Sequence, residues 1–322
     1  MQSGVPRCVA LFCATLVSVY FTYGWMWSAG DPLGDGETIQ ESATFAVALM
    51  GILLAHEMAH YLVARRHGFE LTLPYFIPVP FLAFGTFGAI IGLKSPPKSR
   101  TALLEMGAAG PLAGAAVAIF CIALGLGEVG PATCVEAIAQ DAPTMVVWLF
   151  QLMEPIDRFL AQFIEAPPEG HLVVSILGDP PVFKLLGTWV LGEPPGRFDT
   201  LGPLTLAGWV GCLLTAMNLI PIGQLDGGHI LNALFPDRAS LISKVLLGLL
   251  FAAGVVAWPG WAFWAFVILL LRAFHALPVP AETRLTLRAK AVVVAVMVAF
   301  GLTFMHTPVA IDTMPDPCAT TP

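Results

Sequence analysis

Long apolar runs recur along the chain and are separated by shorter polar segments. About 20 consecutive apolar residues are enough for a helix to cross roughly 30 Å of hydrocarbon. Runs of that kind lie near residues 8–27, 44–66, 103–126, 203–222, 241–258 and 289–305, and a shorter one lies at 261–275. The pattern predicts an all-α polytopic membrane protein with about six to seven transmembrane helices.

The composition agrees with this fold class. Hydrophobic residues make up 57% of the 322 residues, charged residues make up 11%, and the mean hydropathy is +0.80. These values exclude an ordinary soluble domain and predict a lipid bilayer as the surrounding partner. The net charge is -7 and the few basic residues lie mostly beside the apolar runs, so no nucleic-acid partner is expected. The six cysteines show no CxxC spacing and predict neither a disulfide framework nor a cysteine metal site.

One apolar segment is unsuited to a straight helix. Residues 73–94, LPYFIPVPFLAFGTFGAIIGLK, contain Pro74, Pro78 and Pro80 near the start and Gly85 and Gly88 further on. Proline removes a helical hydrogen bond, and irregular backbone is tolerated at membrane depth only where protein or a polar cavity satisfies it. We therefore predict a re-entrant hairpin or a short strand pair near 73–94. The alternative is an ordinary span with a kink.

The longest break in the apolar pattern runs from about 127 to 202. It shows little of the alternation expected of strands, so we predict a loop with interfacial helices rather than a folded soluble domain. Within it, residues 144–164 form an apolar stretch that is interrupted by four polar or helix-breaking residues. An amphipathic helix at the membrane surface is favoured there, and a spanning helix is the alternative.

A histidine pair and a glutamate stand inside the second apolar run, in the sequence HEMAH at 56–60. On a helix, His56 and His60 lie four residues apart on one face, within reach of a single metal ion. Glu57 lies beside them, where it can take a proton from a water molecule. Burying an ionisable side chain in the middle of a membrane span costs free energy, so such residues usually face a cavity and have a functional role. A chance match, with the histidines simply packed in a core, is the competing interpretation.

A catalytic zinc ion needs a third protein ligand besides two histidines. In the segment 215–235, TAMNLIPIGQLDGGHILNALF, Asp226 ends an apolar run and is followed by Gly227 and Gly228. Two glycines allow a sharp turn and a close approach of the backbone, so Asp226 is the candidate. Its competing interpretation is a helix-end residue facing water. His229 could support the metal site, although packing or solvent exposure is favoured for it.

The two motifs together resemble the site-2 protease family of intramembrane zinc metalloproteases, peptidase family M50. HEMAH at 56–60 and NLIPIGQLDGGH at 218–229 each lie on their own apolar run, in the family's order and spacing. GAAGPLAG at 107–114, on the intervening run, is similar to a small-residue segment of the family. The resemblance covers roughly residues 44–306 and implies proteolysis of membrane-protein substrates within or near a transmembrane helix.

The resemblance also implies roles for particular residues. One Zn²⁺ per chain would be held by His56, His60 and Asp226, and Glu57 would act as general base and acid. Asn218 would contact the substrate backbone or the developing oxyanion. A membrane-embedded hairpin would present a backbone edge to the substrate through Gly85, Thr86, Phe87 and Gly88. The alternative function is a membrane zinc transporter or metal sensor that uses the same buried ligands.

The proposed organisation along the chain follows from these elements. We expect a first transmembrane helix with an acidic outer loop at 1–43, an HExxH-bearing core with the hairpin at 44–126, an extracytoplasmic loop at 127–202, an Asp-Gly-bearing catalytic helix at 203–235, and C-terminal transmembrane helices and a tail at 236–322. The first run is interpreted as an uncleaved helix rather than a signal peptide, because the match to a cleavage site is poor. No oligomeric state is predicted.

The distribution of basic residues predicts the orientation. With seven spans, twelve of the 15 basic residues share one side of the membrane. They are Arg7, Arg65, Arg66, Lys94, Lys98, Arg100, Arg238, Lys244, Arg272, Arg284, Arg288 and Lys290. The positive-inside rule makes this side cytoplasmic. We therefore expect a protein of a bacterial inner (cell) membrane with a cytoplasmic N-terminus and an active site toward the cytoplasmic side.

Overall fold

The structure, a computed structural model, is mostly helical. It describes residues 4–28, 30–80, 84–93, 97, 99–131, 171–270 and 285–315. The helices are α1 (Val5–Met26), α2 (Gly36–Arg66), α3 (Arg100–Gly125), α5 (Pro181–Leu191), α6 (Pro203–Leu219), α7 (Asp226–Leu234), α8 (Ala239–Val256), α9 (Pro259–Leu270) and α10 (Leu287–Thr303). The predicted segment 144–164 lies outside the described residues.

Among the described residues, four helices are long and apolar enough to cross a membrane by length and composition, namely α1, α2, α3 with the short turn that follows it, and α8. The runs expected at 203–222 and 261–275 form shorter apolar helices, α6 with 17 residues and α9 with 12 residues. The run at 289–305 corresponds to α10, which has 17 residues. A membrane protein is therefore supported, and the finer number of six to seven spans stays a prediction.

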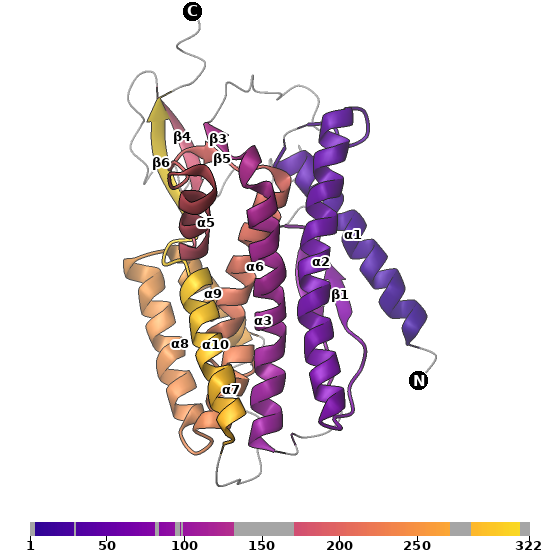
Figure 1. The fold of residues 1–322 in the computed structure, drawn as a ribbon, viewed down its shortest axis with the longest axis vertical. Coiled ribbons are helices and arrows are strands. Elements are labelled where there is room, and N and C mark those ends of the chain that lie inside the picture. Colours follow the sequence, from indigo (N-terminus) through magenta and orange to yellow (C-terminus); the bar gives the residue numbers. More distant parts are fainter. Residues whose placement is uncertain are drawn as a thin grey trace, which may run out of the picture.

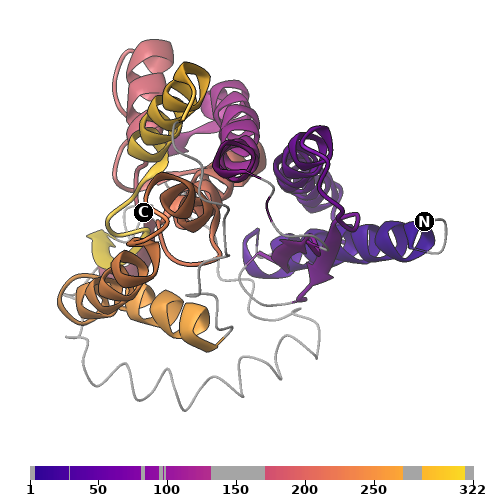
Figure 2. The same cartoon turned by 90° about the horizontal axis from the view of Figure 1, so that it is seen from below.

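Helix α3 is the centre of the assembly. It packs against α2 on one side and α6 on another, and α7 and α10 also contact it (Figures 1 and 2). Its sequence contains Gly107, Gly110 and Gly114, and small residues let neighbouring helices approach closely in lipid. The two apolar runs that carry the predicted metal ligands are therefore brought to the same central helix.

Three short two-stranded sheets accompany the helices in the described part of the chain, so the expectation of an all-α fold was incomplete. Strand β1 (Tyr75–Pro78) pairs with β2 (Thr86–Ile90), β3 (Gly130–Pro131) with β5 (Asp199–Thr200), and β4 (His171–Leu177) with β6 (Val309–Pro315), all antiparallel. Strand β4 lies in the segment where strands were not expected. Its partner β6 comes from the far end of the chain, and such long-range pairing is not visible in local alternation.

The segment 73–94 forms the strand pair that its prolines and glycines allowed. Tyr75 pairs with Ile90 and Phe76 with Ala89. At the turn end, Gly85 has a φ of 81°, a left-handed conformation that favours glycine. The Ser18 hydroxyl of α1 donates a hydrogen bond to the Gly85 carbonyl at 2.6 Å, which fixes the hairpin to α1. Its insertion at membrane depth stays a prediction.

Candidate metal centre

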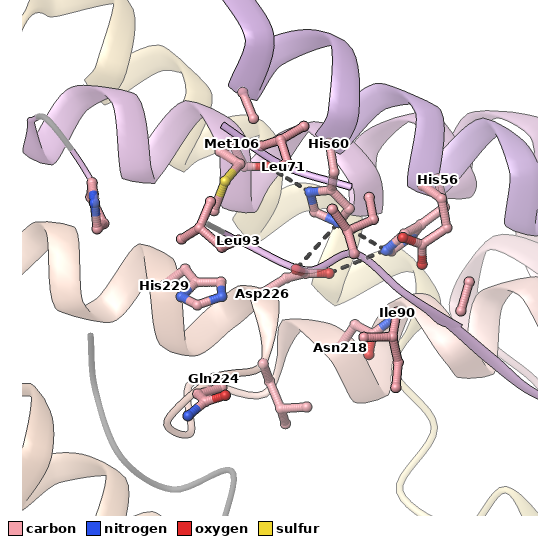
Figure 3. Close-up of a pocket in the computed structure, with 16 residues that line it drawn as sticks. His56, His60, Leu71, Ile90, Leu93, Met106, Asn218, Gln224, Asp226 and His229 are labelled. Carbon is pink, nitrogen blue, oxygen red and sulfur yellow. Dashed lines mark hydrogen bonds and ion pairs between the residues drawn. The ribbon is translucent and has the colours of Figure 1, made fainter. Parts of the chain in front are cut away.

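The three predicted ligands come together between α2 and α7 (Figure 3). One carboxylate oxygen of Asp226 lies 3.2 Å from Nε2 of His56, and the other lies 3.2 Å from Nε2 of His60. The two Nε2 atoms are 3.1 Å apart. One ligand atom from each residue lies within 4.8 Å of the others, so the group could hold a metal ion.

The chemistry of this group fits zinc. Two imidazole nitrogens and one carboxylate oxygen are a ligand set of catalytic zinc sites, which leave a fourth position open. All three side chains are largely withdrawn from solvent, with exposed fractions of 8% for His56, 13% for His60 and 15% for Asp226. Buried ionisable groups are costly unless they pair with one another or bind a metal. A bound cation would compensate the cost of burying His56, His60 and Asp226 together, and this explains why the three side chains converge.

A backbone carbonyl orients one of the histidines. Nδ1 of His60 lies 2.7 Å from the carbonyl oxygen of Met106 in α3. A carbonyl can only accept, so Nδ1 carries the proton and donates it. Nε2 of the same ring then has a free lone pair directed at the other two ligands. This is the arrangement that commonly fixes a metal-binding imidazole.

The small residues of α3 make room for the histidines. A Cβ atom added at Gly110 would lie 2.0 Å from Nε2 of His60, and one added at Gly114 would lie 3.1 Å from Nδ1 of His56. The first distance is an impossible overlap. The motif GAAGPLAG, which is similar in sequence to a small-residue segment of the site-2 protease family, therefore packs directly against the candidate metal centre.

We expect Gly110→Ala to weaken zinc binding about tenfold to a hundredfold, because the new methyl group must displace the His60 ring. Zinc content at limiting free zinc measures this directly. The matched control is Gly51→Ala on α2, where an added Cβ has nothing within 4 Å. Equal zinc affinity of the Gly110 variant and the wild type would contradict the close packing.

A broken helix places the third ligand. The sequence suggested one helix across 203–235, but α6 ends at Leu219 and α7 begins at Asp226. A Cβ added at Gly227 would lie 2.1 Å from the Leu219 carbonyl oxygen. The glycine therefore lets the chain fold back against the end of α6, and this turn directs Asp226 toward α2.

A cavity of about 680 Å³ adjoins the three ligands. Glu57 and Asn218 line it, as the predicted roles require, and His229 and Gln224 line it as well. His229 is three residues after Asp226, and its buried Nδ1 has no hydrogen-bond partner among the described residues. The sequence favoured packing in a core or exposure to solvent for His229. Its position three residues after Asp226 was the one sequence feature that pointed to the metal site.

The hairpin reaches the cavity through the end of β2. Ala89, Ile90 and Ile91 line it, whereas the predicted contact residues 85–88 are not among the lining residues. Figure 3 shows Ile90 beside Asn218. The predicted hairpin segment 73–94 included the lining residues, but no sequence signal distinguished residues 89–91 from residues 85–88.

Apolar helices around a buried His-His-carboxylate group with an adjoining glutamate define the class of helical membrane proteins with a hydrolytic metal centre. A model of the family described as "Peptidase family M50" matches residues 44–257, which contain both motifs. The chain therefore belongs to peptidase family M50, and the resemblance seen in the sequence is confirmed.

Curated relatives are named as probable zinc metalloproteases. The chain is 31% identical over 227 residues to "Probable zinc metalloprotease EGY1, chloroplastic" of Arabidopsis thaliana, covering 69% of this chain and 35% of the relative. It is 34% identical over 215 residues to "Probable zinc metalloprotease EGY2, chloroplastic" of Oryza sativa subsp. indica, covering 66% of this chain and 33% of the relative. The chain thus spans about a third of the length of these relatives. No solved structure matches it significantly.

Proposed function

We propose that this protein is an intramembrane zinc metalloprotease that hydrolyses peptide bonds within or near transmembrane segments of membrane-protein substrates. The observation that supports this most is the convergence of His56, His60 and Asp226 beside a cavity that Glu57 also lines. Membership of a peptidase family and the names of the relatives support a metalloprotease.

In this proposal the three ligands hold one zinc ion per chain. When bound, zinc supplies a Lewis acid that lowers the pKa of water and polarises a peptide carbonyl. The Glu57 carboxylate accepts the proton of the attacking water and then transfers it to the leaving amine. The Asn218 side-chain amide donates a hydrogen bond to the carbonyl oxygen as its negative charge develops. His56 and His60 belong to the proposed core segment 44–126, and Asp226 belongs to the proposed segment 203–235.

The proposed substrate is a transmembrane helix that unwinds locally. A helix in lipid pairs all its backbone groups internally, so its carbonyls are not free for attack until the helix opens. The opened strand needs new hydrogen-bond partners. In the described residues β2 pairs with β1 alone, so no described strand occupies its second edge. Gly85, Thr86, Phe87 and Gly88 would offer this edge to the substrate.

The zinc transporter or metal sensor is not favoured. A transporter needs ligands along a path through the membrane. Among the described residues, the potential ligands form one compact group of three. The peptidase family membership supports hydrolysis at this group rather than passage of the ion.

The helix ends support the proposed orientation. Basic residues occupy the start of α1, the end of α2 and the starts of α3 and α10, namely Arg7, Arg65, Arg66, Arg100, Arg288 and Lys290. Figure 1 places the end of α2 and the starts of α3 and α10 at its lower end and the start of α1 somewhat higher at the right, whereas α5, which carries Lys184, lies in the upper part. The positive-inside rule favours a cytoplasmic lower end. The metal centre lies in the half of α2 nearer this end.

The proposed location is a bacterial inner (cell) membrane with a cytoplasmic N-terminus, whereas the named relatives are chloroplastic. We expect a membrane-impermeant thiol reagent, added outside intact cells that express the protein, to label Cys318. The matched control is Cys318→Ser, which should lose that label. Labelling of Cys318 only after the inner face is exposed would invert the topology.

The experiment that tests the function joins zinc analysis of the purified protein to cleavage of a single-span substrate. The wild type and Glu57→Gln are compared, and the expected result is argued in the Discussion.

A further inference from the structure

A second cavity, of about 520 Å³, is lined by residues from α1, α5, α6, β4 and β6. It is formed where α1 ends, α6 begins and β4 and β6 pair. We call it the outer pocket. Five aromatic side chains line it: Tyr23, Trp27, Phe183, Phe198 and Trp209. Such a lining suits a large apolar side chain.

The turn end of the β1–β2 hairpin reaches this pocket. Phe84 stacks on Trp27, with ring centroids 5.1 Å apart and an interplanar angle of 24°. The Phe84 ring also lies 6.4 Å from Trp209, at an angle of 64°. Both tryptophans line the outer pocket, so one end of β2 is anchored at its wall.

The other end of β2 is at the metal centre. Ile90, the last residue of β2, lines the cavity beside Asn218. Trp209 and Asn218 lie on the same helix, α6, and their nine-residue separation corresponds to about 13 Å. Strand β2 and helix α6 therefore run between the same two cavities. An extended chain at about 3.3 Å per residue needs about four residues for this distance. Along the hairpin, Phe84 and Ile90 are six positions apart, so a substrate strand beside β2 would span the two cavities with about four to six residues.

We propose that the outer pocket is a specificity subsite, which binds a large apolar side chain of the substrate about four to six residues from the cleaved bond. This inference rests on the proposed function. A substrate strand that adds to the second edge of β2, which no described strand occupies, would begin beside Asn218 and run along that edge to Phe84 and the pocket. The subsite lies on the side of the cleaved bond that faces the outer end of α6.

Charge restricts the occupant further. Among its described lining residues the pocket has the carboxylates of Asp179 and Asp199 and one arginine, Arg197. Asp179 forms an ion pair with Lys184 at 3.5 Å, and Arg197 forms one with Asp312. An acidic substrate residue would therefore meet the Asp199 carboxylate and find both nearby cations already paired. The pocket therefore selects a large apolar residue and rejects an acidic one.

Steady-state kinetics with two matched single-span substrates tests the subsite. They carry phenylalanine or aspartate at each position four to six residues from the cleaved bond. Burial of one large apolar side chain is worth about a tenfold or greater difference in affinity. The wild type should therefore show a KM about tenfold lower for the phenylalanine substrate, at similar kcat.

Two variants locate this preference. Phe198→Ala, which leaves the Trp27–Phe84 stack in place, should raise the KM for the phenylalanine substrate severalfold and leave kcat and zinc content unchanged. The matched control is Trp189→Ala, because Trp189 is 84% exposed on α5 and does not line the pocket. An unchanged KM in Phe198→Ala, or an equal KM for both substrates with the wild type, would overturn the proposal.

Crosslinking gives a readout that does not depend on activity. A photoreactive phenylalanine analogue at position 198 is introduced into the inactive Glu57→Gln protein, which is then mixed with the phenylalanine substrate in vesicles. The adduct should map to residues four to six positions from the cleavage site. A crosslink to lipid alone, or to a distant part of the substrate, would overturn the subsite.

The two proposals fail in different ways. If the wild type cleaves no substrate in the presence of zinc, the proposed function fails and the subsite fails with it. If zinc-dependent cleavage is observed but is insensitive to Phe198 and to the residue at the tested substrate positions, only the subsite fails.

Discussion

Replacing Glu57 by glutamine is expected to abolish proteolysis while zinc stays bound. Glutamine has nearly the same size as glutamate but cannot accept the proton of the attacking water, and loss of such acid-base catalysis lowers kcat by about 10³-fold or more. Glu57 is not part of the group of three ligand atoms, so zinc content should stay at one per chain. Zinc analysis and substrate cleavage on the same purified sample measure both quantities.

The matched control for this experiment is Glu37→Gln. Glu37 is an exposed glutamate in the first turn of the same helix, α2, far along the chain from the metal centre. This variant should cleave at the wild-type rate. Cleavage at the wild-type rate by Glu57→Gln itself would show that the assigned mechanism is wrong even with zinc present.

Removing any one of the three ligands should abolish both zinc binding and activity. His56→Ala, His60→Ala and Asp226→Ala each leave two protein ligands, fewer than the three of catalytic zinc sites. Zinc content should fall from about one per chain to near zero in each variant. The joint loss of metal and activity separates these three residues from Glu57, whose replacement should cost activity alone.

His306→Ala is the control for the ligand variants. His306 is exposed, and its backbone carbonyl accepts a hydrogen bond from Trp261 Nε1 at 2.8 Å, a contact that the substitution leaves in place. It should retain both zinc and activity. Full zinc content in Asp226→Ala would place the third ligand elsewhere and contradict the proposed centre.

The ligand positions could be proposed from the sequence because each motif is local. Four-residue spacing puts His56 and His60 on one helical face wherever the helix forms. The need for a third ligand then directed attention to a carboxylate in another apolar run, and Asp226 satisfied it. The structure brings these residues together, and the family match covers both motifs.

Other features were not accessible from local patterns. The expected single helix across 203–235 is two helices, because Gly227 packs against the end of α6. The expected loop at 127–202 contains β4, which is stabilised by β6 more than 130 residues later. In both cases the deciding contact joins residues that no periodicity relates.

By itself, the sequence determined the membrane class, the helical face that carries two histidines with a glutamate next to it, and the irregularity of the segment 73–94. Each follows from the hydrophobicity or backbone freedom of neighbouring residues. Only the tertiary structure decided that Gly110 must be small because the His60 ring occupies its space, and that Phe84 of the hairpin meets Trp27 and Trp209. These contacts depend on how helices and strands distant in the chain pack together, since close packing leaves room for one side chain at each position.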